Sequence, residues 1–329
     1  MLSRWPDWQP ERAGGNDGPM TAIQPDAANS YRSIDVPVPG GELRVGIWEP
    51  TNPAQDDVVP TVLAIHGITA SHRCWLSLAD RLPGHRIVAP DLRGRGRSNE
   101  LPGPYGMQQH AADVTAVLDF LEIPQALVVG HSMGGFVAVT FNSLHPDRVG
   151  ALLLVDGGVP LPLPAGVDPE KAAAALLASV SARLSMTFPD RSAYREYFKA
   201  HPAFVDDWTD AVADYVDYDL VGDEPELHPA TSGAAMSADS FDQSDGDALV
   251  KAWAQVQAGT IFLRAPRGFL NDEPGLWPPD SLRDWREHFP QLDVREVGGV
   301  NHYTILFNEA GLTAVQGAVR ESLERSQRW

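Results

Sequence analysis

A serine lies at the centre of the segment 130–134, which reads G-H-S-M-G, between an apolar run and a stretch with helical character. A G-x-S-x-G turn that joins a strand to a helix is a setting in which a serine becomes a nucleophile, because the tight turn directs its hydroxyl away from the backbone. The alternative is a glycine-rich turn that holds a serine by chance. The strand before the turn and the helix after it favour the nucleophile, so Ser132 is the first candidate catalytic residue.

A serine nucleophile needs a base that takes its proton. Among the ten histidines, His302 is the best candidate because it lies in a glycine-containing loop after the last expected strand and before the final expected helix. From that position its side chain can reach back across the sheet edge. His66 has a competing structural role in fixing its own loop, and we expect the side chain of His131 to leave the turn in another direction.

Four motifs follow one another along the chain: H-G-I at 66–68, D-L-R-G-R-G-R-S at 91–98, G-H-S-M-G-G at 130–135 and G-G-V-N-H at 298–302. Their types and order resemble the α/β-hydrolase superfamily, and the resemblance runs from about residue 34 to about residue 323. It points to the serine-nucleophile branch that carries a cap, similar to esterases and C–C hydrolases. The motifs are specific for the fold and say little about the substrate.

The resemblance implies an α/β fold with an eight-stranded, mostly parallel sheet flanked by helices and a helical cap inserted after the sixth strand. Strand-like and helix-like segments alternate along the chain, as a sheet with helices on both faces requires. A hairpin through residues 39–41 and a helix over 107–121 are also predicted. The strands are expected at 33–38, 42–49, 61–66, 86–91, 126–130, 151–156, 260–265 and 292–297.

The chain divides into three predicted parts. Residues 1–30 are rich in Pro, Gly, Asp and Asn and read as a loose N-terminal arm. The hydrolase core comprises residues 31–159 and 256–329, and residues 160–255 form the predicted cap, or lid. The cap helices are expected at 171–184, 192–200 and 203–219.

The sequence offers two carboxylates as the acid that orients the histidine. The superfamily usually places it after the seventh strand, where the slot in this chain falls on or near Gly268 and the nearest aspartate, Asp272, comes late in a long loop. Some members take the acid from the end of the sixth strand, where Asp156 follows an apolar run. A carboxylate directly after a strand is held rigidly, so we favour Asp156 over Asp272. The alternative role of Asp156 is a structural cap on the next turn.

The resemblance implies that the backbone N–H groups of Ile68 and Met133 form an oxyanion hole, which stabilises the negative charge that develops on the substrate. The side chains of these two residues and of Trp75 are expected to form the apolar floor of the substrate pocket. Cys74 is expected to be a small buried hydrophobe. Residues 91–98 are expected to stabilise their own turn without a catalytic role.

The net charge of −19 argues against nucleic acid or an anionic membrane surface as a partner. No apolar run is long enough to cross a bilayer. The first residues lack the apolar stretch of a secretory signal, so a cytoplasmic location is expected. The single cysteine leaves no intrachain disulfide.

No metal or cofactor is predicted, because the chain has no H-x-x-x-H, no C-x-x-C and no G-K-[ST] motif. The expected partner is a small-molecule substrate, and association into a homodimer is left open. The sequence predicts a carboxylic-ester hydrolase that acts through an acyl-enzyme on a small to medium, partly apolar substrate.

The motifs disfavour one group of functions and leave two alternatives to the esterase. Haloalkane dehalogenases and epoxide hydrolases of this superfamily attack with an aspartate, and Ser132 occupies that position here. Hydrolysis of a C–C bond in a β-diketone or ring-cleavage product, or of a lactone, uses the same three side chains and is the first alternative. A non-catalytic ligand-binding protein is the hypothesis of a different class.

Overall fold

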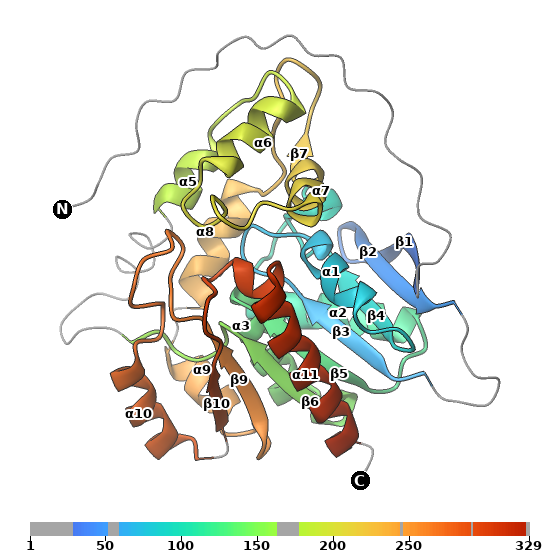
Figure 1. The fold of residues 1–329 in the computed structure, drawn as a ribbon. Helices are drawn as coiled ribbons and strands as arrows, with labels where there is room; N and C mark the ends of the chain where they lie inside the picture. The colour runs from blue at the N-terminus through green and yellow to red at the C-terminus, as the bar shows by residue number, and fades with distance from the viewer. Residues whose placement is uncertain (1–28, 52–58, 163–177, 244–245, 291, 327–329) are drawn as a thin grey trace.

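A computed structural model describes residues 29–51, 59–162, 178–243, 246–290 and 292–326 (Figure 1). Its central layer is an eight-stranded sheet in the order β1-β2-β4-β3-β5-β6-β9-β10. The strands β4, β3, β5, β6, β9 and β10 run parallel to one another, whereas β2 pairs antiparallel with β1 and β4. The predicted α/β class with an eight-stranded, mostly parallel sheet is confirmed. The strands are β1 (Asn29–Val38), β2 (Gly41–Pro50), β3 (Thr61–Ile65), β4 (Arg86–Pro90), β5 (Ala126–His131), β6 (Val149–Val155), β9 (Thr260–Arg264) and β10 (Leu292–Glu296).

The central strands are buried on both faces. Every residue of β3, β5 and β9 is buried, as expected for parallel strands covered by helices on each side. Side chains alternate between the faces, so Leu127 and Val129 belong to one apolar cluster and Val128 belongs to the other. The predicted hairpin is also present, with Val38 opposite Gly41 and Gly40 at a φ of 95°.

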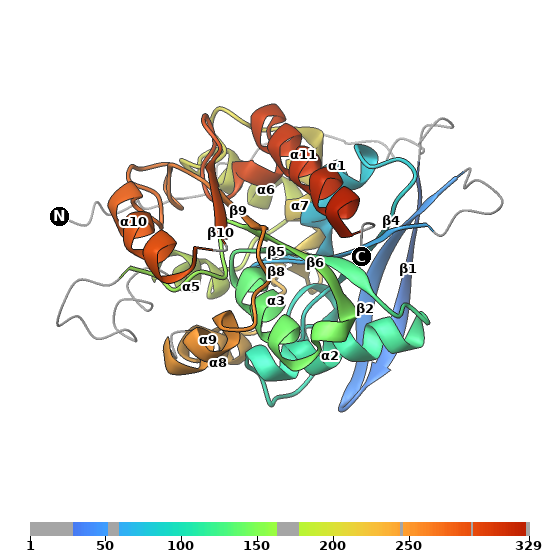
Figure 2. The same cartoon turned by 90° about the horizontal axis from the view of Figure 1, so that it is seen from below.

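Two helical layers sandwich the sheet (Figure 2). One face is covered by α2 (Met107–Phe120), α3 (Met133–Leu144) and α9 (Gly246–Trp253), and the other by α1 (Leu76–Asp80) and α11 (Glu309–Ser326). Further helical segments are η1 (His72–Trp75), η2 (Gly96–Ser98), η3 (Pro146–Arg148), α10 (Pro279–His288) and η4 (Thr304–Leu306).

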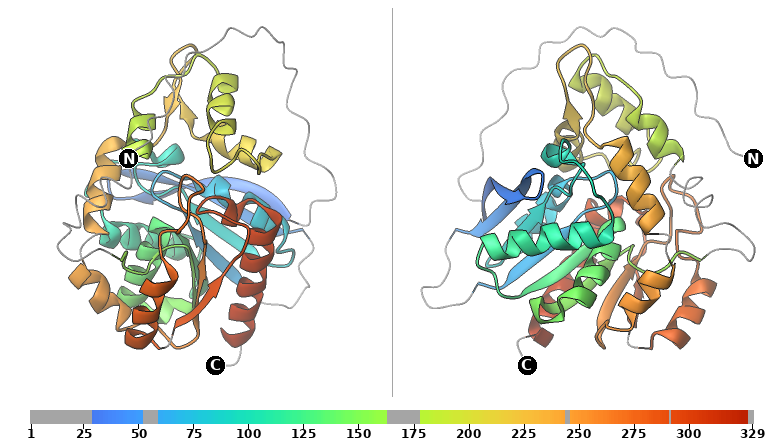
Figure 3. Two further views of the ribbon diagram at one scale, coloured as in Figure 1. Left: turned by 60° about the vertical axis from the view of Figure 1, so that its left-hand side comes forward. Right: turned by 180° about the vertical axis from the view of Figure 1, so that it is seen from behind.

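The chain between β6 and β9, which we call the inserted segment, divides into two parts. Helices α5 (Ala178–Leu184), α6 (Arg191–Lys199) and α7 (Asp210–Tyr218) and the short strands β7 (Leu220–Val221) and β8 (His228–Pro229) lie above the carboxyl ends of the central strands (Figures 1 and 3). Helix α8 (Gly233–Asp242) descends from them towards the core, and α9 joins the core layer beside α3.

Hydrogen bonds tie the end of the inserted segment to the core. Trp253 donates from Nε1 to the carbonyl of Gly158 at 2.8 Å, and Asn142 of α3 donates to the carbonyl of Gln255 at 3.1 Å. A division at residue 255 therefore cuts through a packed interface. A separate cap over 160–255 stays a prediction.

The boundaries inside the inserted segment differ from the predicted ones. The expected helix over 203–219 begins only at Asp210, because the side chain of Thr209 accepts the N–H of Val212 and caps the helix there. Residues 171–177 of the first expected helix lie outside the described residues, as do residues 1–28 of the expected arm. Asn29 and Ser30, the last two residues of the expected arm, belong to β1. None of the described helices is long and apolar enough to span a membrane.

Candidate active site

Ser132 forms the turn between β5 and α3 in a strained backbone conformation. Its φ of 54° and ψ of −125° lie in a region that residues with a Cβ rarely adopt. The turn is close-packed, because a Cβ at Gly134 would come within 2.1 Å of the carbonyl oxygen of Ile65. The N–H of Ser132 donates to Val155 at 3.0 Å, which ties the turn to β6. The surrounding structure therefore imposes the conformation of Ser132.

His302 lies between Ser132 and a buried carboxylate. Its Nε2 is 3.0 Å from Oγ of Ser132, and its Nδ1 is 2.7 Å from Oδ2 of Asp156. Because a carboxylate only accepts hydrogen bonds, Nδ1 carries the proton and donates it. The Nε2 lone pair then accepts the hydroxyl of Ser132. The three side chains form one hydrogen-bonded chain in which a proton can move from serine to histidine.

Asp156 follows β6 directly and is fully buried. Its Oδ1 accepts the N–H of Ala265 at 2.9 Å, and its own N–H donates to Leu263 at 2.7 Å. Its φ of 43° is again unusual for a residue other than glycine. The end of β9 thus fixes the carboxylate from the side opposite His302.

Asp272 occupies a different environment. It is exposed in the loop after β9, and its backbone carbonyl accepts the N–H of Gly268 at 2.8 Å. Among the hydrogen bonds of the described residues, none joins its carboxylate to His302. Of the two carboxylates left open by the sequence, the structure brings Asp156 to the histidine.

Three rings of the described residues lie around the imidazole of His302. Their centroids lie 4.4 Å away for Phe269, 4.9 Å for His131 and 5.6 Å for Tyr303. His131 also donates from Nε2 to the carbonyl of His302 at 2.8 Å. The sequence indicated that the His131 side chain would point elsewhere, and this expectation is wrong. Burial, with the neighbouring His302, lowers the pKa of His131 to about 3, so His131 is neutral.

The two amides predicted to form the oxyanion hole are free to bind a ligand. Within the part of the chain that the structure describes, neither Ile68 N–H nor Met133 N–H donates to a protein acceptor. The peptide before Ile68 is held by His66, whose Nδ1 is 2.8 Å from the carbonyl of Gly67 and whose Nε2 accepts the N–H of Leu92. Since C=O and N–H of one trans peptide point in opposite directions, this bond restrains the Ile68 N–H from one side.

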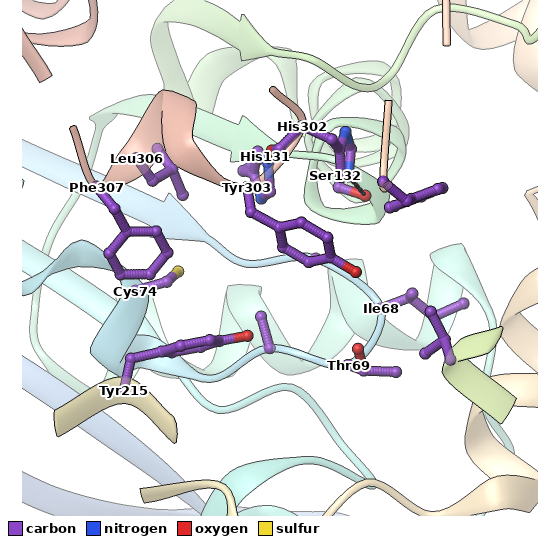
Figure 4. Close-up of a pocket in the computed structure, with 14 residues that line it drawn as sticks. Ile68, Thr69, Cys74, His131, Ser132, Tyr215, His302, Tyr303, Leu306 and Phe307 are labelled. Carbon is purple, nitrogen blue, oxygen red and sulfur yellow. Dashed lines mark hydrogen bonds between the residues drawn. The ribbon is translucent and has the colours of Figure 1, made fainter. Parts of the chain in front are cut away.

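A mainly apolar pocket lies beside Ser132. Figure 4 shows Cys74, Tyr215 and Phe307 grouped at one end and Ser132 with His302 at the other. Tyr303 lies between these groups. Val180 and Tyr215 belong to the inserted segment, so this segment completes the pocket wall.

Two pocket residues expected from the sequence lie elsewhere. Trp75 is fully buried in the apolar cluster that contains Leu78, and Cys74 lines the pocket instead. Successive residues of a 3₁₀-helix point about 120° apart, which places these neighbours on different sides of η1. The side chain of Met133 is also buried in the core, whereas Ile68 lines the pocket as expected.

The aromatic lining was not predicted residue by residue. Tyr215, Phe269 and Phe307 come from α7, the loop after β9 and the end of η4, and no shared spacing connects them. Among the aromatic lining residues, only the position of Tyr303 could be expected from the sequence, because it directly follows the candidate base.

Residues 60–309 match the family described as the alpha/beta hydrolase fold. This match covers well over half of the chain, and the protein belongs to that family. Membership agrees with the strand order, the strained serine turn and the histidine that follows the last strand.

Similarity to individual proteins is more limited. Lipase LipV of Mycobacterium tuberculosis is 40% identical over 120 residues, which cover 36% of this chain and 43% of the lipase. Epoxide hydrolase B of the same species is 32% identical over 194 residues, or 56% of this chain and 50% of that protein. The chain therefore spans half or less of the length of these curated relatives. The crystal structure of E-2-(acetamidomethylene)succinate hydrolase shares the fold, with a TM-score of 0.72, 24% identity and coverage of 90% of this chain and 100% of that chain.

Proposed function

We propose that the protein is a serine hydrolase that cleaves a carboxylic ester of a small to medium, partly apolar substrate. The observation that carries the proposal is the chain of hydrogen bonds from Ser132 through His302 to Asp156, at 3.0 and 2.7 Å. A serine, a histidine and a buried carboxylate in this geometry have the roles of nucleophile, base and orienting acid. The similarity to a lipase supports hydrolysis as the class of reaction.

In the acylation step, Oγ of Ser132 attacks the carbonyl carbon of the ester while Nε2 of His302 takes the hydroxyl proton. The amides of Ile68 and Met133 bind the resulting oxyanion, and Asp156 stabilises the imidazolium. When the tetrahedral intermediate collapses, the C–O bond to the leaving group breaks. His302 then gives its proton to the departing alkoxide, which leaves as the alcohol.

In the deacylation step, water enters the position that the alcohol has left. His302 takes a proton from this water as the oxygen attacks the acyl carbon, and the second tetrahedral intermediate expels Ser132. The proton returns from His302 to Oγ of the serine. The products are one carboxylic acid and one alcohol, and the enzyme is restored.

The pocket supports an uncharged, partly apolar acyl group. Its lining is dominated by aliphatic and aromatic side chains, among them Val180, Tyr215, Phe269 and Phe307. A carboxylate placed among them would lose hydration without gaining a cation from the lining. We also propose that α5, α6 and α7 act as a cap, since Val180 and Tyr215 reach the pocket from this side.

Hydrolysis of a lactone or of a C–C bond uses the same three side chains and is the second candidate. Epoxide opening is a weaker candidate in spite of the similarity to an epoxide hydrolase. Attack of a serine on an epoxide carbon would give an ether, which an activated water does not hydrolyse, whereas an aspartate gives an ester.

Hydrolysis of p-nitrophenyl esters of increasing acyl length tests the proposal. We expect turnover by the wild type with a preference for short acyl chains. Ser132→Ala should lose activity by about 10⁴-fold or more, as removal of the nucleophile from such a site does. Ser143→Ala, a change on the same helix away from the pocket, is the matched control and should retain activity. Wild-type protein that cleaves lactones or β-diketones but no ester would replace the ester proposal by the second candidate.

A further inference from the structure

Arg95, in the loop after β4, has a fully buried guanidinium that contacts both residues of the proposed oxyanion hole. Its Nε donates to the carbonyl of Ile68 at 2.9 Å, and its Nη2 lies 3.9 Å from Sδ of Met133. Its Nη1 donates to the carbonyl of Arg93 at 2.8 Å. One side chain therefore joins two loops that come from different strands.

The charge of Arg95 is balanced by Asp239 of α8, which is equally buried and forms an ion pair with Nη1. Asp239 also accepts the N–H of Gly106 at 2.6 Å and binds Nε2 of His110 at 3.0 Å. A buried guanidinium without a partner would be strongly destabilising. The inserted segment thus supplies the counter-ion that keeps Arg95 in place.

The hydrogen bond from Arg95 completes the restraint of the Ile68 backbone. The peptide before Ile68 is held at its carbonyl by His66 and by the N–H of Ala70 at 3.1 Å. The peptide after it is held at its carbonyl by Arg95. Because a residue has only two soft backbone dihedrals, fixing both flanking peptides fixes the direction of the Ile68 N–H. Loss of the Arg95 bond would leave the Ile68 amide restrained from one side only, so that it could tilt away from its position.

We propose that Arg95 is a positioning residue that holds the oxyanion-binding amide of Ile68 in place, and that its pair with Asp239 makes this positioning depend on α8. The proposal rests on the proposed function, since it concerns the oxyanion hole of that same site. Preorganised donors act mainly where charge develops. Misplacing them therefore lowers kcat and leaves ground-state binding, and so KM, nearly unchanged.

Arg95→Lys tests the proposal, because lysine keeps the charge and loses the planar fork that binds several acceptors at once. The matched control is Arg93→Lys. Arg93 is almost fully buried in the same loop, but its guanidinium binds Asp113 at 2.8 and 2.9 Å and the carbonyl of Pro102. It does not contact the side chain or carbonyl of either oxyanion residue within the described hydrogen bonds.

Three quantities are measured for each variant: kcat and KM on the best p-nitrophenyl ester, the Tm, and the rate of labelling by a fluorophosphonate. In the labelling step, Oγ of Ser132 attacks phosphorus, fluoride leaves and His302 takes the proton, while the phosphoryl oxygen occupies the oxyanion hole. For Arg95→Lys we expect kcat and the labelling rate to fall by about 10- to 100-fold, with KM changed by about twofold or less. Arg93→Lys should lower the Tm by about as much as Arg95→Lys does, but it should lower kcat and the labelling rate by about threefold or less.

Asp239→Asn is the second variant and keeps the proposal testable if Arg95→Lys does not fold. The amide can still accept the N–H of Gly106, but it no longer balances the guanidinium. We expect kcat and the labelling rate to fall by about 3- to 10-fold at unchanged KM. The proposal is wrong if Arg95→Lys loses no more activity than Arg93→Lys. If Arg95→Lys does not fold, the proposal is wrong when a folded Asp239→Asn keeps wild-type values of kcat and of the labelling rate.

The labelling experiment separates this proposal from the proposed function. Wild-type protein that is labelled at Ser132 but cleaves no ester would refute the ester proposal, and the labelling rates of the variants would still decide the role of Arg95. Wild-type protein that is not labelled has no working oxyanion hole, and both proposals would then fail.

Discussion

The loops after β6 and β9 begin side by side at the carboxyl edge of the sheet, yet they serve the candidate site in different ways. After β6 the chain turns at once, and Asp156 is buried against His302. After β9 the loop over 265–278 is long, and its aspartate, Asp272, is exposed. This longer loop contributes the N–H of Ala265 to Asp156 and the ring of Phe269 to His302.

The two loops make different kinds of contact with His302. A carboxylate that must hold one tautomer of a histidine needs a short, rigid connection to a strand, and Asp156 has one. A ring that packs against the same histidine tolerates a longer connection, because packing depends less on the direction of each atom. Charge therefore comes from the short loop and packing from the long loop.

The largest expected effect is the difference in kcat between the variants in which Asp156 or Asp272 is replaced by asparagine. Asp156→Asn should lower kcat by about 10⁴-fold, because the amide favours the wrong tautomer of His302. Asp272→Asn should change kcat by about threefold or less, since its carboxylate does not contact the histidine. Steady-state kinetics of both variants on one ester measures the contrast. Equal losses would show that both loops supply charge.

A smaller effect is expected from the packing contribution of the long loop. Phe269→Ala removes an edge-to-face contact at 4.4 Å from His302, and such contacts contribute about 0.5–1.5 kcal/mol. If the imidazolium of the transition state depends on this contact, kcat falls by up to about tenfold. Leu270→Ala, at a neighbouring exposed side chain, is the control and should leave kcat unchanged. A loss equal to that of Asp156→Asn would contradict the division between charge and packing.

The conformation of the long loop should affect stability more than rate. Asn271 has a φ of 63°, and its Oδ1 accepts Nδ2 of Asn301 at 3.1 Å. Asn271→Gly and Asn271→Ala both remove this bond, but only alanine opposes the positive φ, at about 1–2 kcal/mol. Urea unfolding should therefore give Asn271→Ala a lower free energy of unfolding than Asn271→Gly by about 1 kcal/mol. Equal values would mean that the backbone relaxes at this position.

Acid should destabilise the region around Ser132 and leave the long loop, which contains no histidine, without a direct contribution. Burial lowers the pKa of His66 from 6.5 to about 4 and that of His131 to about 3. Below pH 6.5 these two histidines bind protons in the unfolded chain but stay neutral in the folded chain until the pH approaches their lowered pKa values. This contribution to stability is therefore complete above pH 6.5 and is lost as the pH falls through the folded-state pKa values.

His131→Gln measures the size of this acid effect, because the amide can donate to the carbonyl of His302 without titrating. Between about pH 7 and pH 5, its urea midpoint should fall less than that of the wild type. A pH dependence of His131→Gln that equals the wild-type one would contradict a lowered pKa of His131 in the folded chain.

Much of the fold could be predicted because its signals are local. Each expected strand overlaps an observed one, since apolar runs bounded by glycine and proline mark buried strands. The inserted segment was predicted less well. The short strands β7 and β8 pair through few residues. Helix α8 depends on buried contacts such as that of Asp239 with Arg95, which no local sequence pattern predicts.

The candidate site shows the same limit. The turn around Ser132 and the loop of His302 have local signatures, whereas the choice between Asp156 and Asp272 depends on which side chain reaches the imidazole in space. Trp75 and Cys74 are neighbours in sequence, and only the course of η1 decides which of them lines the pocket. Arg95 lies within a recognised motif, but its contacts with Ile68 and Met133 join separate loops.

The positive φ values of Ser132 and Asp156 place a stability–activity trade-off at the ends of two neighbouring strands. Such conformations cost about 1–3 kcal/mol each, which the remaining structure must supply. Glycine adopts them freely, so Ser132→Gly should melt at a higher temperature than Ser132→Ala while both lack the hydroxyl. Laboratory evolution of this chain for heat resistance alone would therefore tend to discard the serine, and an activity screen is needed in every round to retain it.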